Sequence, residues 1–228
     1  MRLPVTPSTT LWRELRGEVR RHYPAGRVIV AVDGVDGAGK STFADGLAEV
    51  FAETGDAVFR ASVDGFHRPR AERYARGRSS PEGYYRDSYD YATFRRVLVD
   101  PFRDGAQTAG ATGFQLAAFD VVRDAPEESQ WVSAPRDAVL VVDGIFLHRP
   151  ELRSLWDWSL WLEVPWSVAC ARLALRDGSD PDPEAPANAR YREGQELYVR
   201  EAQPQHAADV IVDNSDLAHP RRIREVVR

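Results

Sequence analysis

The sequence contains very little cysteine: Cys170 is the only one among 228 residues. A lone cysteine cannot form an internal disulfide, so the chain is not a disulfide scaffold, and a reducing compartment suits it. No apolar run approaches the about 18 residues that a membrane helix needs, and segment 1–23 has no apolar core of a signal peptide. We therefore expect a cytoplasmic protein that does not enter a membrane.

Positive charge is not in excess either, because 30 Lys and Arg residues face 35 Asp and Glu residues. The resulting net charge of -5 argues against nucleic acid as a partner, since such proteins normally carry a basic face. A hydrophobic content of 43% is enough for one sizeable core. With no repeat and no low-complexity linker, we predict one domain over 1–228, with a helical extension over 1–24.

Short apolar runs recur along the chain and predict buried strands at 27–33, 57–63, 138–143, 158–164 and 208–212. Segments with helical periodicity lie between them, at 40–53, 91–99, 165–176 and 188–201. A first helix is expected to begin at a cap on Thr9 or Thr10 and to bury Leu11, Leu15 and Val19. This alternation predicts an α/β protein, a three-layer P-loop NTPase fold whose parallel sheet has helices on both faces.

One stretch, 64–136, interrupts the alternation. Its first part, 64–90, is polar, aromatic and rich in arginine, and we expect a long loop with at most a short helix. Its last part, 105–135, is irregular, with short strands expected at 113–120 and 131–133. Loops of this length in a compact domain usually serve a function, so we expect this excursion to hold a second ligand.

A glycine-rich turn follows the first predicted strand and has the Walker A spacing of a P-loop: Gly34, Val35, Asp36, Gly37, Ala38, Gly39, Lys40 and Ser41. Its glycines let successive N–H groups point at phosphate oxygens, and the helix that follows adds its positive end. Lys40 would bridge the β- and γ-phosphates of ATP, Ser41 would bind Mg²⁺, and Thr42 would support the helix start. We expect Asp36 to hydrogen bond to the backbone of the turn.

Two aspartates follow the second and third predicted strands, Asp64 and Asp143. Ligands of open parallel sheets bind at the carboxyl ends of the strands, so both carboxylates should lie beside the P-loop. Phosphoryl transfer needs a carboxylate to deprotonate or orient the acceptor hydroxyl, and we assign that role to Asp64. Asp143 is expected to act on Mg²⁺, to which Asp64 is a further candidate ligand. Taken alone, each could equally be a turn residue before glycine.

Several motifs occur in the order found in the uridine kinase and phosphoribulokinase family of P-loop kinases, which the chain resembles over about 27–214. They are GVDGAGKST (34–42), VDGFH (63–67), YYRDSYDY (84–91), FDVVR (119–123), VVDGIF (141–146), RLALRD (172–177) and ADVIVDN (208–214). The resemblance implies ATP-dependent phosphorylation of a small-molecule hydroxyl.

The resemblance also assigns roles to single residues. Asp64 becomes the catalytic base, and Asp87 a ligand of the acceptor hydroxyls, with Tyr85 in the same segment. Arg123 stands beside the acceptor. The lid spans 172–192 and carries Arg176 to the transferring phosphate. His67 belongs to a basic aromatic cluster that could bind a ring-shaped or phosphorylated acceptor, or could equally be a solvated loop.

The acceptor half departs from the family pattern. Phe119-Asp120-Val121 has no histidine close behind it, and the lid loop 177–186 has no arginine. A nucleoside such as uridine is the first candidate acceptor, and a pantothenate-, riboside- or sugar-like molecule is the alternative. A P-loop ATPase that acts as a switch, and a degenerate binding module, are the non-kinase alternatives. The sequence leaves a homo-oligomer open.

Overall fold

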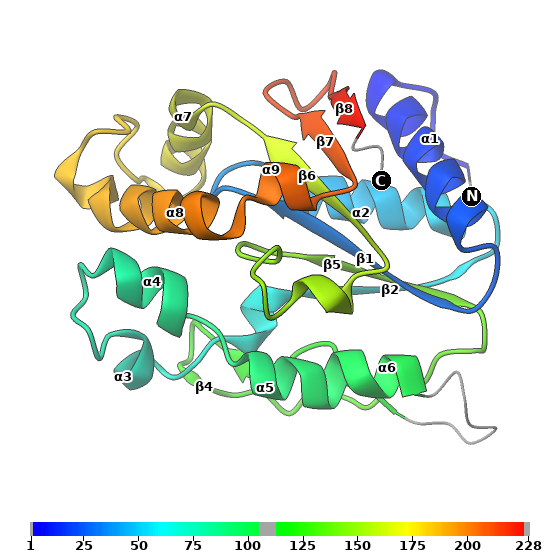
Figure 1. Cartoon of the computed structure of the whole chain (residues 1–228), viewed down its shortest axis with the longest axis horizontal. Helices are drawn as coiled ribbons and strands as arrows, with labels where there is room; N and C mark the ends of the chain where they lie inside the picture. Colours follow the sequence, from blue (N-terminus) through cyan, green and yellow to red (C-terminus); the bar gives the residue numbers. More distant parts are fainter. Residues whose placement is uncertain (1, 105–112, 226–228) are drawn as a thin grey trace.

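The five apolar runs of the sequence form parallel strands at the centre of the computed structural model, which describes residues 2–104 and 113–225 (Figure 1). Their bounds are β1 (Arg27–Gly34), β2 (Ala57–Ser62), β5 (Ala138–Asp143), β6 (Trp158–Glu163) and β7 (Val210–Asp213). The sheet order is β2-β5-β1-β6-β7-β8, and all neighbouring pairs are parallel except β7 with β8. The predicted parallel sheet is therefore confirmed.

The antiparallel edge strand β8 (Arg221–Glu225) was not predicted. Its sequence, RRIRE, has no apolar run by which a buried strand could be recognised. A short, charged strand suits the edge of a sheet, because charge there discourages pairing with other chains.

Helices cover both faces of the sheet, as predicted, and two neighbouring residues of β2 show this. Side chains of adjacent strand residues point to opposite faces. Arg60 reaches Asp45 of α2 (Lys40–Ala52) at 2.9 Å, whereas the ring of Phe59 packs against Phe102 of α6 (Asp100–Asp104) on the other side. Figure 1 shows α5 and α6 on the side of the sheet away from α1 and α2.

The first helix, α1 (Pro7–His22), begins earlier than predicted, since its cap is Thr6 and not Thr9 or Thr10. The Thr6 hydroxyl accepts from the Thr9 N–H, while the Thr9 hydroxyl accepts from the Thr6 N–H, which is a reciprocal capping box. Pro7 fits the first helical position because its missing N–H would have no partner there. Leu11, Leu15 and Val19 are buried, as predicted.

A salt bridge with a pH-dependent contribution ties α1 to the end of α2. The guanidinium of Arg13 donates to Glu53 at 2.8 Å, and the Leu3 N–H donates to the same carboxylate at 2.6 Å. The Arg13 hydrogen bond is the largest cause that lowers the pKa of Glu53 from 4.5 to about 2. A carboxyl with a lowered folded-state pKa stabilises the protein above its unfolded value, and this contribution disappears as the pH falls towards the folded value.

We therefore expect the wild type to lose stability as the pH falls from about 4.5 to about 2, and Glu53→Gln to lose less over the same interval. Urea unfolding of both proteins at about pH 6 and about pH 3 measures this difference. Glu49→Gln, on an exposed position of the same helix, is the control. Equal pH dependence of wild type and Glu53→Gln would contradict the prediction.

The excursion after β2 is more ordered than predicted. It contains η1 (Val63–Phe66) and the short helices α3 (Arg70–Arg73) and α4 (Pro81–Asp87). A continuous helical stretch then runs through α5 (Tyr91–Phe94), the π-turn η2 (Arg95–Val99) and α6. The π-turn precedes Pro101, and the Asp100 N–H bonds to the Arg95 carbonyl five residues back. This wider turn accommodates the proline within the helix.

The strands expected near 113–120 and 131–133 are reduced to smaller pairings. Phe114 and Val132 form an isolated antiparallel bridge, and β3 (Phe119–Asp120) pairs with β4 (Ala125–Pro126). The first part of the predicted irregular segment, 105–112, lies outside the described residues.

The C-terminal half supplies η3 (Arg153–Leu155), α7 (Trp166–Asp177), η4 (Pro186–Asn188), α8 (Ala189–Ala202) and α9 (Pro204–Ala207). Helix α8 packs against α4 at Gly194, where a Cβ atom would lie 2.6 Å from the Tyr84 ring. The glycine thus allows α4, in the excursion after β2, to contact α8 closely. None of the helices in the described ranges combines the length and apolar content that crossing a membrane requires.

Candidate active site

The phosphate-binding loop joins β1 to α2 and depends on two glycines in left-handed conformations. Gly37 has φ 73° and Gly39 has φ 84°, both unfavourable for a residue with a side chain. A Cβ at Gly37 would lie 2.5 Å from the Ala169 carbonyl oxygen. Gly39 is the N-cap of α2 and offers no side-chain acceptor, so the first N–H groups of the helix remain available to an anion. The loop therefore fits a phosphate group.

Lys40 lies at the start of α2 and is the only lysine in the sequence; every other basic side chain of that class is arginine. Its Nζ donates to the Val35 carbonyl at 2.8 Å, which holds the ammonium across the loop. A compact ammonium with three donors can bridge neighbouring phosphates as a point charge, which the planar fork of arginine cannot do in the same way.

Ser41 and Asp143 come together as the sequence predicts. The Ser41 hydroxyl donates to one Asp143 carboxylate oxygen at 2.7 Å, and Arg60 reaches the other oxygen at 3.0 Å. Asp143 is 2% exposed. A hydroxyl and a carboxylate are the hard oxygen donors that Mg²⁺ prefers. In residues 2–104 and 113–225 no three His, Cys, Asp or Glu side chains form a metal site, so Mg²⁺ here would also need phosphate oxygens and water.

Asp64 lies across the same cavity from the phosphate loop. It belongs to η1, is exposed, and accepts a hydrogen bond of 2.8 Å from the Tyr89 hydroxyl. The cavity, of about 430 Å³, is lined by Gly37, Gly39, Lys40, Ser41, Thr42, Asp64, Tyr89, Asp143, Arg172, Arg176 and others. We call it the donor cavity. The candidate base, the lysine and the serine–aspartate pair therefore face one space.

Two arginines of α7 also line the donor cavity. Arg172 donates to the carbonyls of Asn214 and Ser215 at 2.8 Å, and burial lowers its pKa. Arg176, the predicted lid arginine, is 69% exposed and pairs with Asp177 at 2.8 Å. Arg172 is thus fixed against the loop after β7, whereas Arg176 lies at the cavity rim and forms a solvent-exposed ion pair with Asp177.

The structure does not bring together the residues predicted to hold the acceptor. Asp87 pairs with Arg76 at 2.8 Å, and Arg123 has a 77% exposed side chain near Asp120. Tyr85 is 2% exposed, and Arg149 stacks on its ring. It is therefore a core residue and not a cavity residue. The turn of α4 instead brings the neighbouring residue, Tyr84, into contact with the phosphate loop.

His67 lies next to Asp64 but lines a different cavity, together with Arg68, Asp90 and Phe119. Its Nδ1 is 2.8 Å from the Asp64 carbonyl oxygen, and its ring packs against Tyr89 at 4.5 Å. Burial is the main cause that lowers the pKa of His67. A histidine that is neutral near pH 7 and bonded to the backbone of Asp64 can fix η1 in place.

The neighbouring residue Tyr84, which was not predicted as a site residue, contacts the phosphate loop. Its hydroxyl donates to the carboxylate of Asp36, and Gln195 Nε2 lies 3.4 Å from the same oxygen. The expectation that Asp36 bonds to the backbone of its turn is therefore wrong. The partners of Asp36 come from α4 and α8, which lie 48 and 159 residues away in sequence, so local turn chemistry could not reveal them.

A buried polar cluster supports the start of the phosphate loop. Asp33 is fully buried at the end of β1 and accepts from the Gly34 N–H at 2.7 Å. Its other oxygen accepts from the His148 N–H at 3.1 Å, from His148 Nδ1 at 2.8 Å and from the Tyr198 hydroxyl. The cluster connects β1, the segment after β5 and α8, so it fixes α8 relative to the loop.

Comparison with solved structures gives the class of fold, although no family model matches the chain. A possible uridine kinase from Bacillus stearothermophilus aligns with TM-score 0.61 and 22% identity, covering 87% of this chain and 98% of that one. A candidate fructose transport system kinase from a Silicibacter species aligns with TM-score 0.62 and 27% identity, covering 88% and 95%. Phosphoribulokinase from Rhodobacter spheroides aligns with TM-score 0.52 and 20% identity, covering 82% and 70%.

The chain therefore has the fold of P-loop kinases and is structurally similar, at low sequence identity, to those of the uridine kinase and phosphoribulokinase kind. The fold class predicted from the sequence is confirmed.

Proposed function

We propose that this protein transfers the γ-phosphoryl group of ATP to a hydroxyl of a small molecule, with a nucleoside as the first candidate acceptor. The observation that carries the proposal is the donor cavity, where Lys40, the Ser41–Asp143 pair and Asp64 face one another. A phosphate loop alone fits any nucleotide-binding protein. The exposed carboxylate across the cavity adds the group that an acceptor hydroxyl requires.

Each group has a defined task in this reaction. ATP is held by the N–H groups of the loop and by Lys40. Asp64 takes the proton of the acceptor hydroxyl. The oxygen of that hydroxyl forms a bond to the γ-phosphorus, while the bond between the γ-phosphorus and the β–γ bridging oxygen breaks and ADP leaves. Arg176 at the rim offers positive charge to the equatorial oxygens. Mg²⁺ bound at Ser41 and Asp143 would neutralise charge on the β- and γ-phosphates.

Other acceptors are the alternatives, because the structurally similar proteins include a possible uridine kinase, a candidate fructose transport system kinase and a phosphoribulokinase. A pantothenate-, riboside- or sugar-like molecule, or a switch ATPase without an acceptor, would use the same donor cavity. Release of ADP from Mg·ATP, measured over a panel of nucleosides, sugars, vitamins and hydroxy acids, distinguishes them. Stimulation by one class supports a kinase, whereas hydrolysis that no compound stimulates supports the switch.

Because Lys40 is the only lysine, the ATP site can be tested chemically. An acyl-phosphate derivative of ATP, which acylates nearby amines, is expected to label Lys40, and excess Mg·ATP should prevent the labelling. Lys40→Ala should weaken ATP binding by about 10- to 100-fold, since a charge-assisted contact is lost. Calorimetric titration with ATP in the presence of Mg²⁺ measures this change. Unchanged affinity in Lys40→Ala would contradict the assignment of the loop.

A further inference from the structure

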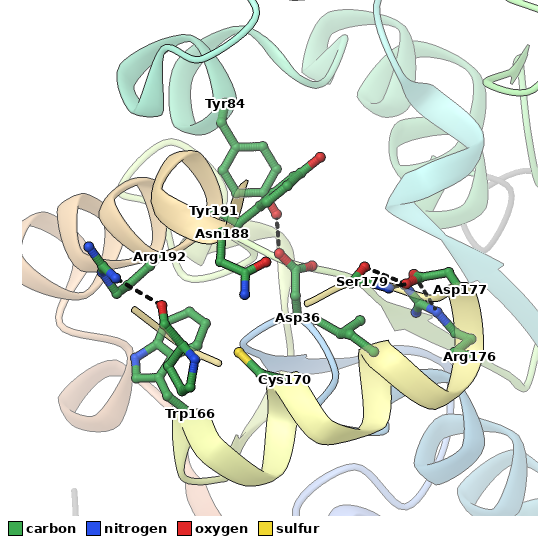
Figure 2. Close-up of a pocket in the computed structure, with 12 residues that line it drawn as sticks. Asp36, Tyr84, Trp166, Cys170, Arg176, Asp177, Ser179, Asn188, Tyr191 and Arg192 are labelled. Atoms are coloured by element: carbon green, nitrogen blue, oxygen red, sulfur yellow. Dashed lines mark hydrogen bonds and ion pairs between the residues drawn. The ribbon is translucent and has the colours of Figure 1, made fainter. Parts of the chain in front are cut away.

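A second cavity lies between the phosphate loop, α7, the lid segment and α8 (Figure 2). Its volume is about 180 Å³. It shares Asp36, Leu173 and Arg176 with the donor cavity, so the two spaces meet beside the phosphate loop. Its other walls include Tyr84, Trp166, Tyr191 and Arg192. We call it the lid cavity.

The carboxylate of Asp36 is unusual in this position. It belongs to a loop built for anions, yet the described part of the chain gives it no ion pair with a cation. One oxygen accepts from Tyr84 and lies near Gln195, and Figure 2 shows the other oxygen pointing into the lid cavity. A carboxylate oxygen without a hydrogen-bond partner can accept a further hydrogen bond.

The Tyr84 hydroxyl is held firmly in its donor role. Its ring packs edge-on against Phe146 at 5.3 Å and Tyr191 at 5.0 Å. Burial, followed by the charge of Asp36, raises the pKa of Tyr84 well above its ordinary value. Phe146 itself has φ 66°, a strained conformation for an aromatic residue. The residue with the strained backbone is thus the one whose ring packs against Tyr84.

The charges of the lid cavity favour a neutral ligand. Arg176 is paired with Asp177 at 2.8 Å, and Arg192 is bonded to the Pro183 carbonyl at 2.8 Å and to Glu184 at 3.0 Å. Arg192 is thus already engaged, and Arg176 lies at the rim that the lid cavity shares with the donor cavity, where its charge serves the transferring phosphate. The free oxygen of Asp36 would repel a carboxylate or phosphate in the lid cavity itself. Arg190 lies over the rings of Tyr84 and Tyr191, 5.3 Å and 5.6 Å from their centroids. Trp166 and the exposed part of Tyr191 therefore offer the apolar surface to the C–H face of a ring.

We propose that the lid cavity is the acceptor subsite, that it takes a neutral hydroxylated ring compound, and that Asp36 accepts a hydrogen bond from a hydroxyl that is not phosphorylated. The ring could be the ribose of a nucleoside or a free sugar, which share this chemistry. Asp36 thereby replaces Asp87 as the specificity-determining carboxylate. This inference rests on the proposed kinase function, since a subsite for an acceptor presupposes phosphoryl transfer.

Binding and kinetics of Asp36→Asn test the inference. Calorimetric titration with uridine, with ribose and with fructose, each in the presence of Mg²⁺ and a non-hydrolysable ATP analogue, is expected to show binding of at least one. For that compound Asp36→Asn should raise the dissociation constant and the acceptor KM by about 10- to 100-fold. The KM for ATP should change by a smaller factor than the acceptor KM, because the phosphate loop binds ATP through backbone N–H groups that the substitution leaves in place.

Two further variants complete the design. Tyr84→Phe removes the donor that orients Asp36 and should raise the acceptor KM by a smaller factor, about 3- to 10-fold. Asp100→Asn, an exposed aspartate of α6, should leave both KM values unchanged. Uridine alone as ligand identifies a nucleoside as the source of the ring, and binding of ribose or fructose identifies a sugar.

Several results would overturn the inference. They are the absence of binding by any neutral ring compound, a preference for D-glycerate, pantothenate or ribulose 5-phosphate, and equal effects of Asp36→Asn on acceptor and ATP. These outcomes leave the kinase proposal standing if ADP release still depends on an acceptor and on Asp64. If ADP release depends on no acceptor, the proposed function fails first, and the binding titration still decides whether the lid cavity holds a ring.

Discussion

Replacing Asp64 by asparagine is expected to lower kcat by about 10²- to 10⁴-fold, the usual contribution of a general base. The substitution preserves shape and still offers an oxygen to the Tyr89 hydroxyl, which now bonds to Asp64 at 2.8 Å. It removes the negative charge and with it the ability to take a proton. Steady-state ADP release with a saturating acceptor measures the effect, and ATP affinity should stay within about twofold of wild type, since the loop is untouched.

Asp64 was predicted both as the base and as a ligand of Mg²⁺, and the same variant separates the two roles. If Asp64 acts mainly through the metal, raising the Mg²⁺ concentration should restore part of the lost rate. If it acts as the base, the loss should persist at all Mg²⁺ concentrations. Asp100→Asn makes the same chemical change on an exposed carboxylate and should keep wild-type kcat. A near-normal kcat in Asp64→Asn with ATP bound would refute both assignments.

The donor half of the site could be predicted because its chemistry is local in sequence. The phosphate loop, Lys40 and Ser41 occupy consecutive positions, and strand ends place Asp64 and Asp143 on one edge of a parallel sheet. The spacing of the P-loop motif and the positions where apolar strands end are enough to predict which residues form such a site. The contact of Ser41 with Asp143, across 102 residues, followed from this edge rule alone.

The acceptor half could not be predicted in the same way. The motif that contains Tyr84, Tyr85 and Asp87 identifies a helix, but the direction of each side chain depends on packing against α8 and Phe146. Gly194 determines how closely α8 approaches α4, and nothing in the sequence of α4 itself indicates this. Tyr85 therefore turned out to be core, and Tyr84 contacts the loop through Asp36.

A similar limit applied to the fold. The apolar runs revealed the five parallel strands, and the helix predicted over 91–99 is present, whereas the charged strand β8 and the continuation of that helix through Pro101 were not predicted. Both depend on neighbours: β8 on the open edge of β7, and the helix on a π-turn that removes the conflict with proline. Hydrophobic patterns indicate which residues are buried. They do not predict elements that form because a neighbouring strand is available for pairing or because the backbone adjusts locally.

The largest effect on stability is expected at Asp33, beneath the phosphate loop. Asp33→Ala should lower the free energy of unfolding by about 3–5 kcal/mol, the usual result of removing one partner from a buried pair. The carboxylate is fully buried and accepts from the Gly34 N–H, the His148 N–H and ring, and the Tyr198 hydroxyl. The His148 N–H would keep a second acceptor, the Tyr198 hydroxyl at 2.8 Å. The other donors would lose their acceptor in a buried space, at the desolvation cost of each unpaired group.

Urea unfolding near neutral pH measures the loss of stability. Two further variants provide a partial disruption of the cluster and a control outside it. Tyr198→Phe removes a single donor and leaves the carboxylate with its other partners, so it should cost about 1–2 kcal/mol. Asp100→Ala removes an exposed carboxylate and should stay within about 0.5 kcal/mol of wild type. Because the cluster joins the loop to α8, Asp33→Ala should also weaken ATP binding at temperatures where the variant is folded. A loss below about 1 kcal/mol would mean that the segment after β5 relaxes to satisfy its own donors, and the cluster would then not be what fixes α8 against the phosphate loop.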